Sequence, residues 1–147
     1  ASTAPQIRYP DCYGIDMSEL GKFIAFQAAI QLLKDRGAEE RIAEVYRNCL
    51  VEVKKPKEIQ RNCVKDIYAP FSPDEVSEKI SELLYPKDIE WSGRLRILFQ
   101  TISNLQSATP ANTGDWYFTG NYPTPGGNKV VTNSFINFIE GRNQRAY

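Results

Sequence analysis

Three cysteines and the complete absence of histidine limit the chemistry that this chain of 147 residues can perform. Histidine is the commonest metal ligand and the commonest general base, so catalysis here would depend on carboxylates, lysine, tyrosine or backbone dipoles. Cys12, Cys49 and Cys63 are too far apart for a CxxC metal or redox motif, and we expect them to be reduced and partly buried. The triplet Arg-Asn-Cys ends at Cys49 and again at Cys63, which puts both cysteines on nearly the same helical face. Small apolar side chains explain this repeat more simply than a thiol pair does.

Two places in the sequence could receive a phosphate. Residues 125–129 contain two glycines followed by Lys129, and glycines let backbone N–H groups converge on an anion. The segment lacks the endings of a P-loop and of a dinucleotide fingerprint, so a plain turn is the preferred interpretation. Asp16 precedes an expected helix and is first of all its N-cap. Ser18 could place its hydroxyl at the positive end of that helix, where a phosphate is stabilised.

Two charged clusters have simpler explanations than a site. Residues 54–57 read Lys-Lys-Pro-Lys, which we interpret as a solvated turn, with a nucleotide-binding patch as the second interpretation. Glu39 and Glu40 fall in the first turn of an expected helix, where the helix dipole favours acidic side chains.

The composition is that of an ordinary globular domain. The 18 basic and 18 acidic residues give zero formal net charge, which argues against nucleic acid or an anionic membrane as the main partner. Apolar residues make up 41% of the chain and charged residues 24%, and the length is that of one domain. No apolar run approaches the roughly 20 residues of a membrane helix, and no basic stretch precedes an apolar one at the start. We expect a cytoplasmic protein.

The spacing of apolar residues predicts helices over most of the chain. They are expected from near Asp16 or Ser18 to Gly37, over 42–53, from Pro56 to 67, from Ser72 to 85, in a short stretch beginning with 102–105, and from about Thr132 to Gly141. Ser72 has the clearest start signal, because proline follows it and glutamate at the third helical position completes a capping box. Residues 6–9 are expected to be extended, and residues 94–99 and 116–118 to be strands, the last followed by a Pro/Gly turn.

Several segments together resemble one known family. They are residues 7–17 with Tyr13-Gly14-Ile15-Asp16, the helix at 18–25, the helix at 74–80, the strand and helix at 97–105, and Phe-Thr-Gly-Asn-Tyr-Pro-Thr at 118–124. In this order and at this spacing they are similar to the C-terminal part of amidophosphoribosyltransferase, also called glutamine phosphoribosylpyrophosphate amidotransferase.

The resemblance implies an α/β, helix-rich fold: the C-terminal portion of a type I phosphoribosyltransferase domain with a helical insertion. Residues 1–147 would then be a single C-terminal fragment of a longer parent. Residues 1–32 would supply the terminal strand and helix, and residues 33–71 a helical insertion. Residues 72–147 would supply a helix, a strand, the Phe-Thr-Gly-Asn-Tyr-Pro-Thr turn and the C-terminal helix.

The resemblance also implies an activity for the parent. The family makes 5-phosphoribosylamine from phosphoribosyl pyrophosphate and glutamine with Mg²⁺, in de novo purine synthesis, and the implied parent is a homo-oligomer that also binds purine nucleotides. Tyr13, Asp16 and Ser18 would lie near a nucleotide or phosphate. The family's N-terminal cysteine and its acidic-pair loop are not in this sequence, so the catalytic residues and the Mg²⁺ site are expected upstream. The fragment alone is expected to be inactive.

Two further expectations concern a cofactor and an alternative function. Some relatives bind an iron–sulfur cluster through cysteines, but here Asp11 stands at one such position and residues 111–117 contain no cysteine, so no cluster is expected. The alternative is a non-catalytic helical interaction module or a nucleotide-binding regulatory module, the latter suggested by Asp16 and the glycine-rich segment.

Overall fold

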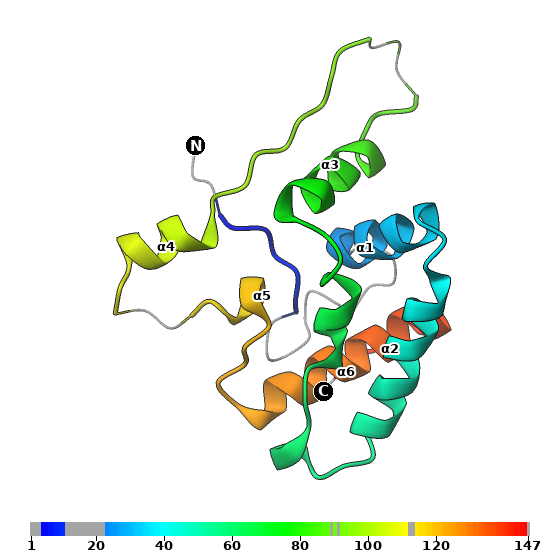
Figure 1. The fold of residues 1–147 in the computed structure, drawn as a ribbon, viewed down its shortest axis with the longest axis vertical. Helices are drawn as coiled ribbons and strands as arrows, with labels where there is room; N and C mark the ends of the chain where they lie inside the picture. Colours follow the sequence, from blue (N-terminus) through cyan, green and yellow to red (C-terminus); the bar gives the residue numbers. More distant parts are fainter. Residues whose placement is uncertain (1–3, 11–22, 89, 91, 112–113, 147) are drawn as a thin grey trace.

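The computed structural model describes residues 4–10, 23–88, 90, 92–111 and 114–146, which are mostly helical (Figure 1). The helices are α1 Ile24–Asp35, α2 Glu39–Glu52, α3 Pro73–Leu83, α4 Ile102–Ala108, α5 Trp116–Thr119 and α6 Pro125–Glu140, with the 3-10 segments η2 Lys57–Ile59 and η3 Cys63–Ile67 between α2 and α3. Within the described ranges, no helix is both long and apolar enough to cross a membrane.

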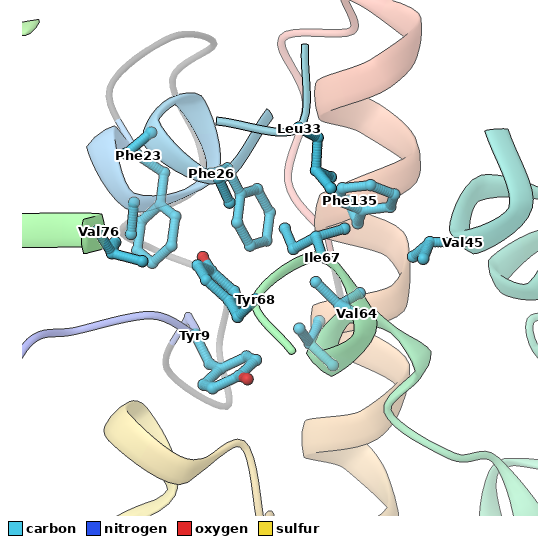
Figure 2. Packing of buried hydrophobic residues seen from close by; sticks show 14 of the residues in the cluster. Tyr9, Phe23, Phe26, Leu33, Val45, Val64, Ile67, Tyr68, Val76 and Phe135 are labelled. Atoms are coloured by element: carbon cyan, nitrogen blue, oxygen red, sulfur yellow. The ribbon is translucent and has the colours of Figure 1, made fainter. Parts of the chain in front are cut away.

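The core lies where α1, α3, α6 and η3 meet (Figure 2). Phe26 of α1 is fully buried at its centre, and Phe135 of α6, Ile67 of η3 and Val76 of α3 surround it. The apolar residues whose spacing predicted the first helix are therefore the ones that face the core. Residues 33–71 share this core, because Val45 of α2 is buried in the same cluster. The expected insertion thus packs into the body of the fold and is not an appendage.

Arginine–carboxylate and lysine–carboxylate pairs hold α1 against α3. Arg36 follows α1 and forms an ion pair with Glu75 of α3, and Lys79 of α3 lies 2.8 Å from Asp35 of α1. Gly37 then turns the chain away at a φ of +65°, which glycine adopts without strain and which ends α1 where the sequence predicted.

The capping box at the start of α3 is confirmed. The Ser72 hydroxyl accepts a hydrogen bond from the Glu75 backbone N–H at 3.2 Å, and the Glu75 carboxylate accepts one from the Ser72 N–H at 2.8 Å. Pro73 occupies the first helical position, where its missing N–H is not needed.

A Ser72→Ala variant is expected to lose about 1 kcal/mol of its free energy of unfolding, because one end of the capping box loses its acceptor. Urea denaturation should show a lower midpoint with an unchanged m value. Ser92→Ala is the matched control, because Ser92 is exposed and makes no hydrogen bond in the described part of the chain, and it should leave the midpoint unchanged. An equal shift in both variants would contradict a capping role for Ser72.

The third predicted helix is wrong in type. Instead of one α-helix from Pro56 to residue 67, the chain forms the two short 3-10 segments η2 and η3. They are separated at Gln60, whose ψ of 142° is extended. Asn62 then starts η3 by accepting a hydrogen bond from Val64 N at 3.1 Å. An asparagine that caps a new segment interrupts the apolar spacing that suggested a continuous helix.

The two expected strands are not strands in this structure. Residues 94–99 are extended but irregular, and the one β-bridge among the described residues joins Pro5 to Gln100 in parallel. Residues 116–118 lie in helix α5, which Gly120 ends at a φ of +70°. Aromatic and β-branched residues favour a strand only where a neighbouring strand supplies hydrogen bonds and packing. The helix-rich part of the expected fold is therefore confirmed, whereas no sheet is present in the described residues to make it α/β.

The last helix begins earlier than the sequence predicted. It starts at Pro125 and not near Thr132, so the expected Pro/Gly turn is the first turn of α6. Proline at the first helical position is compatible with this start, although two glycines follow it. Its end at Gly141 is confirmed, with a φ of +69° there.

Candidate functional site

Parts of two of the segments that resemble the family meet in the structure. The backbone N–H groups of Arg8 and Tyr9 donate to the Tyr117 carbonyl oxygen at 2.9 and 3.1 Å. The Tyr122 hydroxyl donates to the carbonyl oxygen of Pro10 at 2.5 Å. These hydrogen bonds join residues 8–10 to residues 117–122, which are more than a hundred positions away in the sequence. We call this arrangement the motif junction.

Gly120 is at the centre of the motif junction. Its carbonyl oxygen accepts a hydrogen bond from the Asn62 side chain at 3.0 Å. A Cβ atom at this position would lie 2.7 Å from Asn62 Nδ2 and 2.8 Å from Tyr9 Cζ, closer than side chains approach. The glycine of Phe-Thr-Gly is therefore required both by its left-handed backbone and by the atoms that pack against it. Asn121, the next residue, accepts a hydrogen bond from the Lys65 ammonium.

The second half of the motif packs on the start of α6. The Tyr122 ring lies against Gly127, where a Cβ atom would be only 2.2 Å from Tyr122 Cδ1. Gly127 thus lets the tyrosine reach across to Pro10. The role of this glycine is close packing, whereas the sequence suggested a plain turn or phosphate binding.

Adjacent glycines in α6 should respond oppositely to alanine. Gly127→Ala is expected to destabilise the protein by about 1–3 kcal/mol, because the base of the Tyr122 ring must shift. Gly126→Ala is the matched control: its nearest neighbour would be Thr124 Oγ1 at 3.9 Å, an ordinary contact. It should be neutral or stabilise by roughly 0.4–1 kcal/mol, because alanine loses less backbone entropy in a helix than glycine. Thermal unfolding measures both, and a loss of equal size in the two variants would refute this packing.

Two buried tyrosines join the motif junction to the core. The rings of Tyr9 and Tyr68 meet edge to face with centroids 5.5 Å apart, and the Tyr68 hydroxyl donates to the Arg8 carbonyl oxygen at 2.8 Å (Figure 2). Burial raises the pKa of both phenols above the ordinary tyrosine value. Tyr9 contributes packing here, and Tyr68 contributes both packing and a hydrogen bond.

No protein-family model, curated protein or solved structure matches this chain.

The residues that were predicted to lie near a phosphate follow the motif junction in the sequence. Tyr13, Asp16 and Ser18 lie outside the described residues, as do Asp11 and Cys12. The chain enters that segment at Pro10 and leaves it at Phe23, and both of these residues are buried. Tyr122 thus holds the point at which the chain enters the candidate phosphate segment.

The other sequence candidates are dispersed. Residues 125–129 lie at the start of α6. Residues 54–56 follow α2, and Lys57 begins η2. Glu39 and Glu40 occupy the first turn of α2, as predicted. No group of three or more cysteine, aspartate or glutamate side chains that could hold a metal ion occurs in the part of the chain that the structure describes.

Cys49 and Cys63 are both free thiols, the first buried and the second half-buried. Burial, with nearby negative charge acting in the same direction, raises the pKa of Cys49 to about 12. Burial also raises the pKa of Cys63. A raised pKa keeps a thiol protonated and therefore weakly nucleophilic, so both behave as small core residues, which is the interpretation that the sequence favoured.

Three contributors to the site are not evident from the sequence. Asn62 contacts Gly120, Gln6 accepts a hydrogen bond from Arg8, and Tyr9 packs on both Gly120 and Tyr68. For Gln6 the sequence offers no signal beyond its place in the segment that was expected to be extended. For Asn62 the signal is its place in the Arg-Asn-Cys repeat, where the cysteines are the more conspicuous residues.

Proposed function

We propose that this chain is the C-terminal part of a glutamine-dependent amidophosphoribosyltransferase. The parent would make 5-phosphoribosylamine from phosphoribosyl pyrophosphate and glutamine with Mg²⁺, as a cytoplasmic homo-oligomer in de novo purine synthesis. This chain would complete a type I phosphoribosyltransferase sheet and add a mostly helical cap. It carries no catalytic residue in this proposal, and no iron–sulfur cluster.

One observation carries the proposal. The segment that leads into Tyr-Gly-Ile-Asp and the segment Phe-Thr-Gly-Asn-Tyr-Pro-Thr are bonded to each other through Tyr122, Pro10 and the Tyr117 carbonyl. The contact between two segments that resemble the same family, far apart in sequence, is what supports the proposal. Tyr13, Asp16 and Ser18 would follow directly and lie near a nucleotide or phosphate of the assembled enzyme.

The extended segments support the part of the proposal that concerns a sheet. Residues 94–99 form one backbone hydrogen bond, from Ile97 N to Ser81 Oγ at 3.1 Å, and Gln100 N then donates to the Ala4 carbonyl oxygen. Leu98 is 68% exposed. Backbone groups and apolar side chains left open in this way are what neighbouring strands of a parent sheet would cover.

A second candidate function is a non-catalytic helical interaction module, with nucleotide-binding regulation as a variant of it. The helix-rich body and the exposed side chains of Ile59 and Leu84 favour an interaction module. The reading frame upstream of residue 1 decides between the candidates. An N-terminal cysteine and an acidic-pair loop in that frame support the enzyme, whereas their absence supports the interaction module.

The chain by itself is expected to catalyse neither half of the reaction. Release of ammonia from glutamine needs an activated nucleophile, and the cysteine that the family uses for it is expected outside these 147 residues. Transfer of ammonia to the ribose needs Mg²⁺ and loop amides on the departing pyrophosphate. We expect glutamate and pyrophosphate to form no faster than in a heat-inactivated control when the chain is incubated with both substrates and Mg²⁺. Turnover that persists through further purification would place an active site within these 147 residues.

A further inference from the structure

A groove with a volume of about 340 Å³ lies between α3 and the segment that runs into α4. Its lining includes the charged side chains of Arg8, Asp74, Glu78 and Arg96 and the apolar side chains of Ile97 and Phe99. The volume falls within the range of roughly 300–1,000 Å³ that is usual for small-molecule sites. We call it the Arg8 groove.

Arg8 is held in a fixed orientation. The oxygen of the Gln6 side chain accepts a hydrogen bond from Arg8 Nε at 2.6 Å, and the Arg8 guanidinium lies over the Tyr68 ring, 5.5 Å from its centroid. Gln6 is itself only 6% exposed, and its amide nitrogen donates to Ser77 Oγ at 2.9 Å. The two terminal nitrogens of Arg8 make no hydrogen bond or ion pair in the described structure. A guanidinium fixed in this way presents two parallel donors to a carboxylate at little entropic cost.

The α3 wall of the groove carries the opposite charge. Asp74 and Glu78 are one helical turn apart, and both are exposed. Neither forms an ion pair or a side-chain hydrogen bond in the described part of the chain. Arg8 lines the same groove, yet it lies beyond the 4.0 Å that defines an ion pair with either carboxylate. Opposite charges therefore share one small groove without neutralising each other.

This arrangement selects a ligand that carries both charges. With Arg96, the lining holds two cationic and two anionic side chains, so an anion alone or a cation alone would lie near side chains of its own charge. A zwitterion of suitable size can place its carboxylate near the arginine side chains and its ammonium group near the carboxylates at the same time. Ile97 and Phe99 add an apolar surface, which favours a ligand that also has an apolar side chain.

We propose that the Arg8 groove binds a free α-amino acid with an apolar side chain. The ligand carboxylate accepts hydrogen bonds from the terminal nitrogens of Arg8, the ammonium group donates to Asp74 or Glu78, and the side chain packs against Ile97 and Phe99. The site uses only residues of the described chain, so the 147-residue protein tests it separately from the proposed enzymatic function.

The test is calorimetric titration of the 147-residue protein with L-phenylalanine. We expect saturable binding at millimolar concentration or below. Arg8→Lys should weaken it by about tenfold or more, because lysine cannot form the paired hydrogen bonds of a guanidinium. The double variant Asp74→Asn/Glu78→Gln should weaken it to a similar extent. Arg94→Gln is the matched control: Arg94 lines a neighbouring hollow but not the Arg8 groove, so the affinity should not change.

Two further probes separate the charges of the ligand. N-acetyl-L-phenylalanine amide keeps the ring but lacks both charges, and inorganic phosphate supplies an anion only, so neither should bind. Circular dichroism establishes that each variant is folded, and the double variant alters only exposed side chains, so it tests the site even if Arg8→Lys does not fold. Absence of saturable binding by L-phenylalanine would overturn the proposal. Equal affinity for the uncharged amide, or an unchanged affinity in the double variant, would overturn it as well.

Discussion

A Phe26→Ala variant is expected to lose about 3–5 kcal/mol of its free energy of unfolding, a large effect for a single truncation in a core. Phe26 is fully buried, and the centroid of its ring lies 4.9 to 5.6 Å from those of three other phenylalanine rings, two of them on α6. Alanine removes the ring and leaves a cavity that helices on three sides cannot close. Because a domain is typically stabilised by only about 5–15 kcal/mol, much of the stability would be lost.

Guanidinium denaturation followed by far-ultraviolet circular dichroism measures this loss. Leu98→Ala is the control for truncation of an apolar side chain, because Leu98 is 68% exposed. It should change the free energy of unfolding by less than about 0.5 kcal/mol. If Phe26→Ala were no more destabilising than Leu98→Ala, the position of α1 against α6 would be wrong.

Gly120→Ala is expected to destabilise the protein by about 2–5 kcal/mol. The left-handed backbone at Gly120 contributes roughly 1–2 kcal/mol of this cost for any residue with a Cβ atom. The close approach of the buried Tyr9 ring and of Asn62 contributes about 1–3 kcal/mol more, because both must move. The variant should also loosen the contact between the two segments of the motif junction.

Gly37→Ala separates these two contributions. Gly37 has a φ of +65°, close to the +70° of Gly120, but a Cβ atom there would have no neighbour within 4 Å. It should therefore cost only the backbone strain, about 1–2 kcal/mol. The difference between the two variants, measured by thermal unfolding, reports the packing at the motif junction. Equal losses would mean that Tyr9 and Asn62 do not press on Gly120.

Elements whose signals are local could be predicted from the sequence. Ser72 and Glu75 satisfy each other within one helical turn, so the capping box is visible in four consecutive residues. The apolar spacing of Phe26, Ile30 and Leu33 likewise indicates which side of α1 faces the core. Glycine at 37 and 141 ends two helices for the same local reason.

Elements that depend on distant residues could not be predicted. Residues 94–99 have the composition of a strand, but a strand forms only beside another strand, and only Pro5 bridges to Gln100 next to them. Gly127 looks like part of a turn because glycine is a poor helix former, whereas its position is decided by the Tyr122 ring. The bonds from Tyr122 to Pro10 and from Asn62 to Gly120 cross long stretches of sequence, and no local pattern encodes them.

The most direct test of the proposed function is the activity of the complete reading frame that contains these 147 residues. Its purified product should be assayed for pyrophosphate release from phosphoribosyl pyrophosphate, with Mg²⁺ and glutamine present. We expect release that requires glutamine, yields one glutamate for each pyrophosphate, and disappears when residues 1–147 of the present numbering are deleted. A complete product that is folded but releases no pyrophosphate in the presence of glutamine would contradict the proposal that this chain belongs to an amidophosphoribosyltransferase.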